Sequence, residues 1–313
     1  MHALLSQLLT ASATPEPLAG VDAWWRRHLA ETAEFDRPVQ RAVAGGFAAD
    51  RPAYAFASGY QEALRCLLGD LADAQPTRLA LCATEAGGNH PRAIQSRLES
   101  DGDGYRLSGE KTYATLGTHA DGYLVVASVG ADERGRNRLA VVRVPAGRAG
   151  VTVEDAVPDA RAIVPEIPHA RLRFDAVRVE PDERVPGDGY DRWLKPFRTI
   201  EDAHVFAAVA AWLLQVGRRS EWPAEHLEAL LLALVAVDGV ATADPSQPTT
   251  HLALAGLIAH VDRVVQACEP HWDAVDEPTR TRWRRDRALL RVAGAARARR
   301  REVAWQLVGR SQA

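Results

Sequence analysis

Residues 101–128, DGDGYRLSGEKTYATLGTHADGYLVVAS, place hydroxyl groups and an aromatic ring between two alternating apolar runs. Both runs have the period-two pattern of β-strands. Between them stand Thr112, Tyr113 and Thr115, with little that a hydrophobic core would take. A polar apex with an aromatic centre, carried on a β scaffold, indicates a binding surface. The alternative is an ordinary exposed hairpin, because threonine is common in strands.

Three segments of the chain must position these residues, and their periodicities differ. Residues 1–76 carry apolar residues at helical spacing, interrupted at TPEPLAG, GG and RP. Residues 77–186 change to a period of two, with runs separated by Gly, Asp and Pro. Residues 187–313 return to helical spacing, with four helices predicted over 198–219, 223–239, 248–270 and 279–309. The sequence therefore predicts an α+β chain with N-terminal helices, a central antiparallel β-barrel or sandwich, and a C-terminal four-helix bundle.

The composition excludes several classes of protein. A chain of 313 residues with a net charge of −3 has no excess of basic charge for nucleic acid or an anionic membrane. The longest apolar run, residues 227–237, is too short to span a bilayer. The N-terminus lacks the basic region of a signal peptide, and the three cysteines are far apart. We therefore expect a cytoplasmic protein.

The sequence lacks the motifs of metal sites, phosphate-binding loops and serine nucleophiles. The ten histidines include no H-E-x-x-H, and no Cys/His cluster has ligand spacing, so we expect no metal site. The segment GADERGRNR contains glycines without a phosphate-loop pattern. No serine stands in a G-x-S-x-G setting, which leaves serine-nucleophile chemistry unsupported.

The segment TEAGGNHPRAIQSRLESDGDGYRLSGEKTYATLGTHADGYLVVAS resembles the middle domain of the acyl-CoA dehydrogenase family. That family has a T-E-P-x-x-G-S-D loop before a strand, followed by D-G-x-G-Y-x-L-x-G-x-K-x-[WFY]-I-T-N-G. The later segment LRFDAVRVEPDERVPGDG resembles the family's F-x-x-V-x-V-P segment and its glycine-rich exit into the C-terminal helices. The resemblance covers residues 79–190 and implies the three-part fold of the family, with a shortened N-terminal part.

The resemblance implies FAD as cofactor and an acyl-CoA thioester as substrate. Thr84 falls on the position whose hydroxyl and backbone meet the pyrimidine side of the flavin. Thr115 falls on the threonine near flavin N5, and Tyr113 on the aromatic residue that packs against the ring. His90 stands at the serine position that touches the FAD pyrophosphate and the substrate. These side chains suit flavin binding, because a flavin needs a flat apolar wall and a few hydrogen-bond donors directed at its N1, O2 and N5 atoms.

Several positions depart from the family's pattern. The serine and aspartate of its loop are His90 and Pro91 here, and Pro91 removes a backbone donor. The family's R-x-x-F-G segment is replaced by Arg218 and Arg219 without Phe-Gly. The catalytic glutamate that the family carries near its C-terminus has no counterpart.

The catalytic base is therefore open. The family's chemistry removes a proton from the carbon α to a thioester while hydride leaves the β carbon for flavin, and a carboxylate is the standard base. Some members place it early in the first C-terminal helix, where this chain has Glu201 and Asp202. The alternative is that two acids in a first turn simply complement the helix dipole.

The last segment of the chain is rich in arginine. From Thr279 onward eleven arginines and two acids give a local charge of 11 − 2 = +9. Arg280, Arg284, Arg287 and Arg291 share one face of the predicted helix. This face is either solvated opposite an acidic neighbour, or it captures phosphates of FAD or CoA, also across a subunit interface.

These observations predict a flavin-dependent acyl-CoA dehydrogenase-like oxidoreductase that acts on the CH–CH group of an acyl thioester. We expect a homo-oligomer, or a hetero-oligomer with a related subunit. The alternatives are a non-catalytic family member that serves as a partner or scaffold subunit, and a flavin monooxygenase-type relative.

Overall fold

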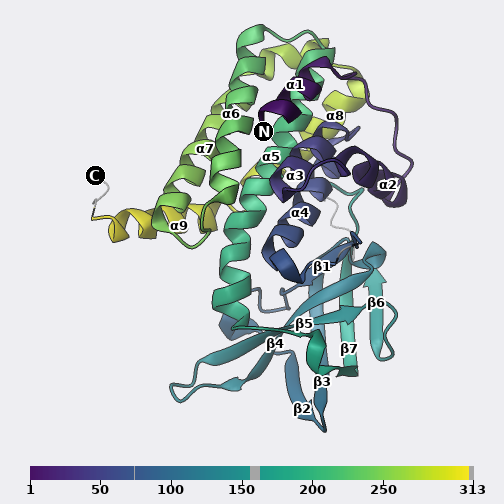
Figure 1. Ribbon diagram of the computed structural model, residues 1–313, viewed down its shortest axis with the longest axis vertical. Helices are drawn as coiled ribbons and strands as arrows, with labels where there is room; N and C mark the ends of the chain where they lie inside the picture. The colour runs from purple at the N-terminus through teal and green to yellow at the C-terminus, as the bar shows by residue number, and fades with distance from the viewer. Residues whose placement is uncertain (74, 156–162, 310–313) are drawn as a thin grey trace. The chain divides into compact units, whose positions relative to one another are not determined.

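The computed structural model of the chain describes residues 1–73, 75–155 and 163–309, which form two compact units (Figure 1). Unit 1 comprises Met1–Gly69, Arg161–Glu166 and Phe197–Ala313, and unit 2 comprises Asp70–Ala160 and Ile167–Pro196. Unit 1 is helical and draws on both ends of the sequence, whereas unit 2 holds the strands. The domain ranges 1–76, 77–186 and 187–313 stay predictions.

Unit 2 is built on one eight-stranded sheet. Its strands are β1 (Leu79–Cys82), β2 (Arg97–Asp101), β3 (Gly104–Thr115), β4 (Gly122–Ala131), β5 (Asn137–Pro145), β6 (Val151–Asp155), β7 (His169–Val179) and β8 (Arg184–Val185). They follow the order β6-β7-β3-β2-β4-β5-β8, and β1 pairs with β4 beside this path. β4 pairs in parallel with β1 and β2, and the other pairs are antiparallel. Among the described strands β6 and β8 do not pair with each other, so the sheet is open and the predicted closed barrel does not form.

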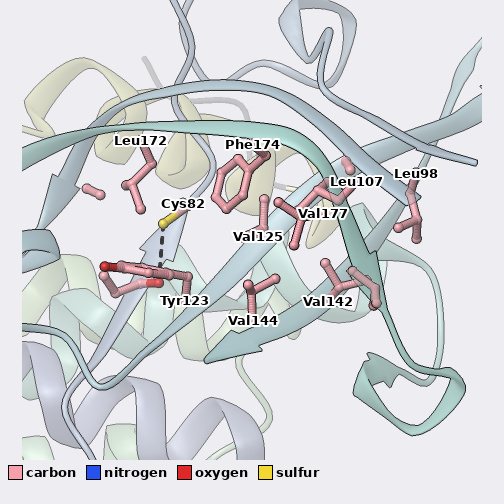
Figure 2. Close-up of a cluster of buried hydrophobic side chains, with 14 of the residues drawn as sticks. Cys82, Leu98, Leu107, Tyr123, Val125, Val142, Val144, Leu172, Phe174 and Val177 are labelled. Carbon is pink, nitrogen blue, oxygen red and sulfur yellow. Dashed lines mark hydrogen bonds between the residues drawn. The ribbon is translucent and has the colours of Figure 1, made fainter. Parts of the chain in front are cut away.

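Alternate strand positions supply the core of unit 2 (Figure 2). Leu107, Val125, Val142 and Phe174 gather in the same interior and are at most 2% exposed. Successive side chains of a strand point to opposite faces, so every second residue reaches this interior. Fully burying one such side chain stabilises the fold by about 1.5–3 kcal/mol. The period of two predicted for residues 77–186 therefore correctly indicated a β unit.

The N-terminal helices of unit 1 are α1 (His2–Thr10), α2 (Val21–Thr32), α3 (Pro38–Phe47) and α4 (Pro52–Leu68). The glycine pair Gly45-Gly46, predicted to interrupt a helix, lies within α3. A Cβ at Gly45 would stand 2.3 Å from His28 Nδ1, and one at Gly46 would stand 2.2 Å from the carbonyl oxygen of Ala208. The prediction of a break was wrong, because these glycines allow close helix packing.

The C-terminal helices are α5 (Lys195–Arg219), α6 (Ala224–Thr242), α7 (Pro248–Ala267), α8 (Glu277–Asp286) and α9 (Gly294–Leu307). The helical C-terminal region is confirmed, but the helix predicted over 279–309 is divided by the 3₁₀ turn η7 (Arg287–Arg291). Asp286 lies at the break, and its buried carboxylate accepts a 2.9 Å hydrogen bond from Val164 N–H. This tertiary anchor outweighs the helical propensity of the local sequence. A simple four-helix bundle is not confirmed.

The break also divides the predicted arginine face. Arg280 lies on α8, whereas Arg287 and Arg291 lie on η7, where the angular spacing of residues differs. Arg280 lies 3.5 Å from Asp273, and Arg287 lies 2.6 Å from Glu269. The prediction of one continuous face was therefore wrong, and part of its charge is paired locally.

Short turns complete the described chain. They are η1 (Gly69–Leu71), η2 (Pro91–Ala93), η3 (Gly117–His119), η4 (Pro181–Glu183), the π-helical η5 (Gly189–Leu194) and η6 (Glu269–Ala274). None of the helices among the described residues combines the length and the apolar character of a transmembrane span.

Candidate functional site

The polar apex of β3 is a β-bulge. β3 has one extra residue relative to β7 between Lys111 and Ala114, because these residues pair with Leu172 and Ala170. Within the bulge Tyr113 has a φ of 58°, a left-handed conformation that is strained for an aromatic residue. Bulges re-aim side chains and often lie beside active sites. An observed strain of this kind supports a functional hypothesis for the apex.

The bulge turns the ring of Tyr113 outward. Its side chain is 62% exposed, and its ring meets the His169 ring edge-on, with the centroids 5.9 Å apart. His169 is half-buried and pairs with Thr115, which is also half-buried. Burial lowers the pKa of His169, so its ring is neutral at pH 7. The result is an aromatic surface with a neutral imidazole and a hydroxyl beside it.

The loop after β1 lies against this apex. The backbone N–H of Thr112 donates to the carbonyl oxygen of Thr84 at 2.8 Å. The structure thus brings Thr84 next to the strand that carries Tyr113 and Thr115, the three residues that the sequence assigned to one site. What each of them binds stays a prediction.

A buried ion pair holds this loop in place. The Glu85 carboxylate accepts hydrogen bonds from Lys111 Nζ (2.6 Å), Gln95 N–H (2.6 Å), and Ser96 N–H (3.0 Å) and Oγ (2.8 Å). Burial alone would raise the pKa of Glu85, but these bonds outweigh it and the pKa is lowered. Lys111 is fully buried. Its ammonium group therefore serves to bind Glu85 and fix the loop.

The Glu85–Lys111 pair was not predicted from the sequence, although a signal for it was present. Lys111 stands four residues after the core residue Leu107, on the same side of β3 by strand period. A lysine on an inward face is costly unless it is paired. Such a position calls for a buried carboxylate, and Glu85 supplies it.

His90 has a local role in the same loop. Its side chain is exposed, and Nδ1 accepts a 3.2 Å hydrogen bond from Arg92 N–H at the start of η2. A tight turn precedes it, where Glu85 and Gly88 exchange two backbone hydrogen bonds and Gly88 has a φ of 100°. His90 therefore caps its own turn, and its assignment to a cofactor stays a prediction.

The two acids on α5, in unit 1, differ in their surroundings. Both carboxylate oxygens of Asp202 accept hydrogen bonds from Arg297 and Arg300. Glu201 is half-buried, and within the described residues its carboxylate has no hydrogen bond or ion pair. Burial, and after it the negative charge of Asp202, raise the pKa of Glu201 to about 7. A carboxyl group with this pKa can accept a proton at neutral pH, which is what a general base needs.

The described part of the chain contains no candidate metal-binding site. No group of three or more His, Cys, Asp or Glu side chains there could hold a metal ion.

Comparison with known proteins identifies the sheet unit. Residues 80–177 match the model of the acyl-CoA dehydrogenase middle domain. The sheet unit is therefore similar to the middle domain of the acyl-CoA dehydrogenase family. The match includes Thr84, Glu85, the whole of β3 and His169, so the bulged apex lies within the matched residues.

Several solved structures share the fold of this chain. An FAD-dependent dehydrogenase is 14% identical, with a TM-score of 0.72 over 99% of this chain and 98% of that chain. Butyryl-CoA dehydrogenase from Megasphaera elsdenii is 15% identical, with a TM-score of 0.62 over 88% and 84%. The prolyl acyl carrier protein oxidase AnaB is 14% identical, with a TM-score of 0.65 over 92% and 90%. At these identities the likeness shows a common fold.

Proposed function

We propose that the protein is a flavin-dependent oxidoreductase that oxidises the CH–CH group of an acyl thioester. The observation that carries this proposal is the apex of β3. There the chain holds a strained backbone and an exposed aromatic ring, in a domain of the acyl-CoA dehydrogenase family. Strained backbone of this kind costs about 1–3 kcal/mol and is concentrated at active sites and ligand-binding sites. Binding of a planar cofactor by the Tyr113 ring would account for it.

The residues at the apex suit an isoalloxazine ring. Tyr113 offers an exposed flat surface, and the hydroxyls of Thr115 and Thr84 are placed on the same strand and the loop bonded to it. When bound, FAD supplies the acceptor for hydride. In our proposal Tyr113 covers the ring, Thr115 donates near N5, Thr84 lies at the pyrimidine side, and His90 faces the pyrophosphate.

Glu201 is the base in this proposal, and Asp202 is not. A general base must be free to accept a proton in its deprotonated form. Asp202 already accepts from two arginines, whereas Glu201 has no partner among the described residues. Glu201 would take the proton from the carbon α to the thioester.

The decisive experiment is the visible spectrum of the purified protein, followed by anaerobic addition of acyl thioesters. The proposal expects flavin absorption near one equivalent, and bleaching when a substrate thioester is added. Absence of flavin after reconstitution with FAD would instead support a non-catalytic scaffold subunit, which the departures at His90 and Pro91 favour. Bound flavin that no acyl thioester reduces, but that consumes oxygen with an external reductant, would favour a monooxygenase-type relative.

Assembly through the C-terminal helices is a further part of the proposal. Leu232 is 59% exposed and Val235 is 43% exposed on α6, one turn apart on its outer face. Apolar side chains grouped in this way are typical of protein contacts. We expect a homo-oligomer, or an oligomer with a related subunit, and light scattering that shows a monomer at micromolar concentration would contradict it.

A further inference from the structure

The C-terminal helix α9 is fastened to α5 through Asp202. Arg297 donates to one oxygen of Asp202 from Nε (2.9 Å) and Nη2 (2.7 Å), and Arg300 donates to the other oxygen at 2.5 Å. The side chain of Asp202 is 7% exposed, and those of the two arginines are 15% and 16% exposed. Three charge-assisted bonds to one largely buried carboxylate form a strong and specific link.

Arg297 has a fixed position in this link. Its Nη1 donates to the carbonyl oxygen of Leu290 at 2.5 Å, and its guanidinium lies 5.0 Å from the centre of the Phe206 ring. Each of its three nitrogens is therefore hydrogen-bonded, and its plane packs on an aromatic residue of α5. These contacts hold its charge beside Asp202 and Phe206 of α5.

Glu201 is subject to this charge although it does not pair with it. Three charged groups act on its carboxyl: Asp202 and Arg198 from α5, and Arg297 from α9. After burial, Asp202 raises the pKa of Glu201, while Arg297 and Arg198 lower it. Arg300 makes one hydrogen bond to Asp202, whereas Arg297 makes two.

We infer that Arg297 is a positioning residue for the proposed base: it neutralises Asp202 and supplies the positive charge that lets Glu201 exist as a carboxylate. The inference rests on the proposed function, since it explains how a buried acid beside another acid can work as a base. Docking of α9 on α5 is then part of the catalytic apparatus, although α9 itself touches no reacting group.

The test uses variants with opposite expected signs in the full-length protein. Arg297→Gln should raise the titration midpoint of Glu201 by about one pH unit, because an opposite charge is lost. Asp202→Asn should lower the midpoint, because a like charge is lost. Arg300→Gln is the matched control, which removes one bond to Asp202 and should give a smaller shift. Arg297→Lys keeps the charge and should restore most of the wild-type midpoint.

The midpoint is read from the infrared band of the protonated carboxyl, assigned by its loss in Glu201→Gln. The pH profile of flavin reduction should shift in the same direction. Equal shifts in Arg297→Gln and Arg300→Gln, or shifts of the same sign in Arg297→Gln and Asp202→Asn, would reduce Arg297 to a structural link and overturn the inference. The proposed function fails separately, if Glu201→Gln reduces flavin as fast as the wild type.

Discussion

Glu85 in unit 2 is buried and Glu201 on α5 in unit 1 is half-buried, yet their pKa values shift in opposite directions. Glu85 accepts four hydrogen bonds and has a lowered pKa, whereas Glu201 has no partner in the described chain and a raised pKa of about 7. Burial raises the pKa in both cases. The difference comes from the surrounding groups: hydrogen bonds and the charge of Lys111 lower the pKa of Glu85, whereas the charge of Asp202 raises that of Glu201 further. It separates a carboxylate that holds structure from one that is available for chemistry.

The two units also differ in the kind of unfavourable feature that they contain. Unit 2 satisfies its buried charges and places strain in the backbone of Tyr113. Unit 1 keeps regular helical backbone around Glu201 and leaves a carboxyl unpaired. Both arrangements cost stability, and in both the cost falls at a residue of the proposed site.

The largest expected effect follows from replacing the unpaired acid. Glu201→Gln should lower the rate of flavin reduction by an acyl thioester at least about 100-fold, because an amide cannot accept the α-proton. The flavin spectrum of the variant should match the wild type. Stopped-flow reduction checks this, with Glu225→Gln on the exposed start of α6 as the control. A wild-type rate in Glu201→Gln would remove this residue from the mechanism.

Breaking the satisfied pair should affect stability instead. Lys111→Met leaves Glu85 buried without its main partner and should cost about 3–5 kcal/mol of unfolding free energy. The control is Arg106→Met, which breaks the exposed pair with Asp101 at 2.5 Å and should cost less than about 1 kcal/mol. Urea unfolding followed by circular dichroism measures both. Equal losses of unfolding free energy in the two variants would show that the buried pair stabilises the fold no more than the exposed pair does.

The pH dependence of stability should distinguish the same two regions. The folded-state pKa of Glu201 lies above its unfolded value, so its protonated form favours the fold and its ionisation opposes it. Glu201→Gln should therefore stabilise the protein above pH 7, by roughly 1–3 kcal/mol, and have little effect below about pH 4.5. Urea titrations at pH 4.5, 6 and 8 would show the trend. A variant that is less stable than the wild type at pH 8 contradicts it.

The strain at the apex can be tested with two substitutions that both remove the ring. Tyr113→Gly relieves the left-handed backbone, whereas Tyr113→Ala retains it, so the glycine variant should be more stable than the alanine variant by about 1 kcal/mol. Both variants should weaken FAD binding, because they delete the aromatic surface. Thermal unfolding and FAD titration measure the two effects. If alanine is the more stable of the two, the backbone at Tyr113 is not strained in solution.

The smallest expected effect is that of one hydroxyl. Thr115→Val keeps the shape and strand propensity of the residue, and should weaken FAD by about 0.5–1.5 kcal/mol through loss of one hydrogen bond. The midpoint potential of the flavin should shift as well, since a donor at N5 stabilises the reduced ring. Unchanged affinity and potential in both Thr115→Val and Tyr113→Ala would mean that the apex is only a bulged strand.

The sequence by itself determined the order of helices, strands and helices, and the likeness of residues 80–177 to the acyl-CoA dehydrogenase middle domain. Apolar alternation marks which side chains of a strand are buried, so Leu107 and Val125 revealed their strands before any contact was known. The resemblance to the family's motifs assigned Thr84, Tyr113 and Thr115 to one site, and the structure has them on a strand and the loop bonded to it.

Only the tertiary structure decided how distant residues meet. Whether the sheet closes depends on its end strands, and whether Gly45 and Gly46 break a helix depends on His28 and Ala208. The roles of the two acids on α5 were open in the sequence, because Arg297 and Arg300 lie almost a hundred residues away from them. Local periodicity carries no information about such pairs, yet the pKa of a buried carboxyl is set by the charges and donors that surround it in space.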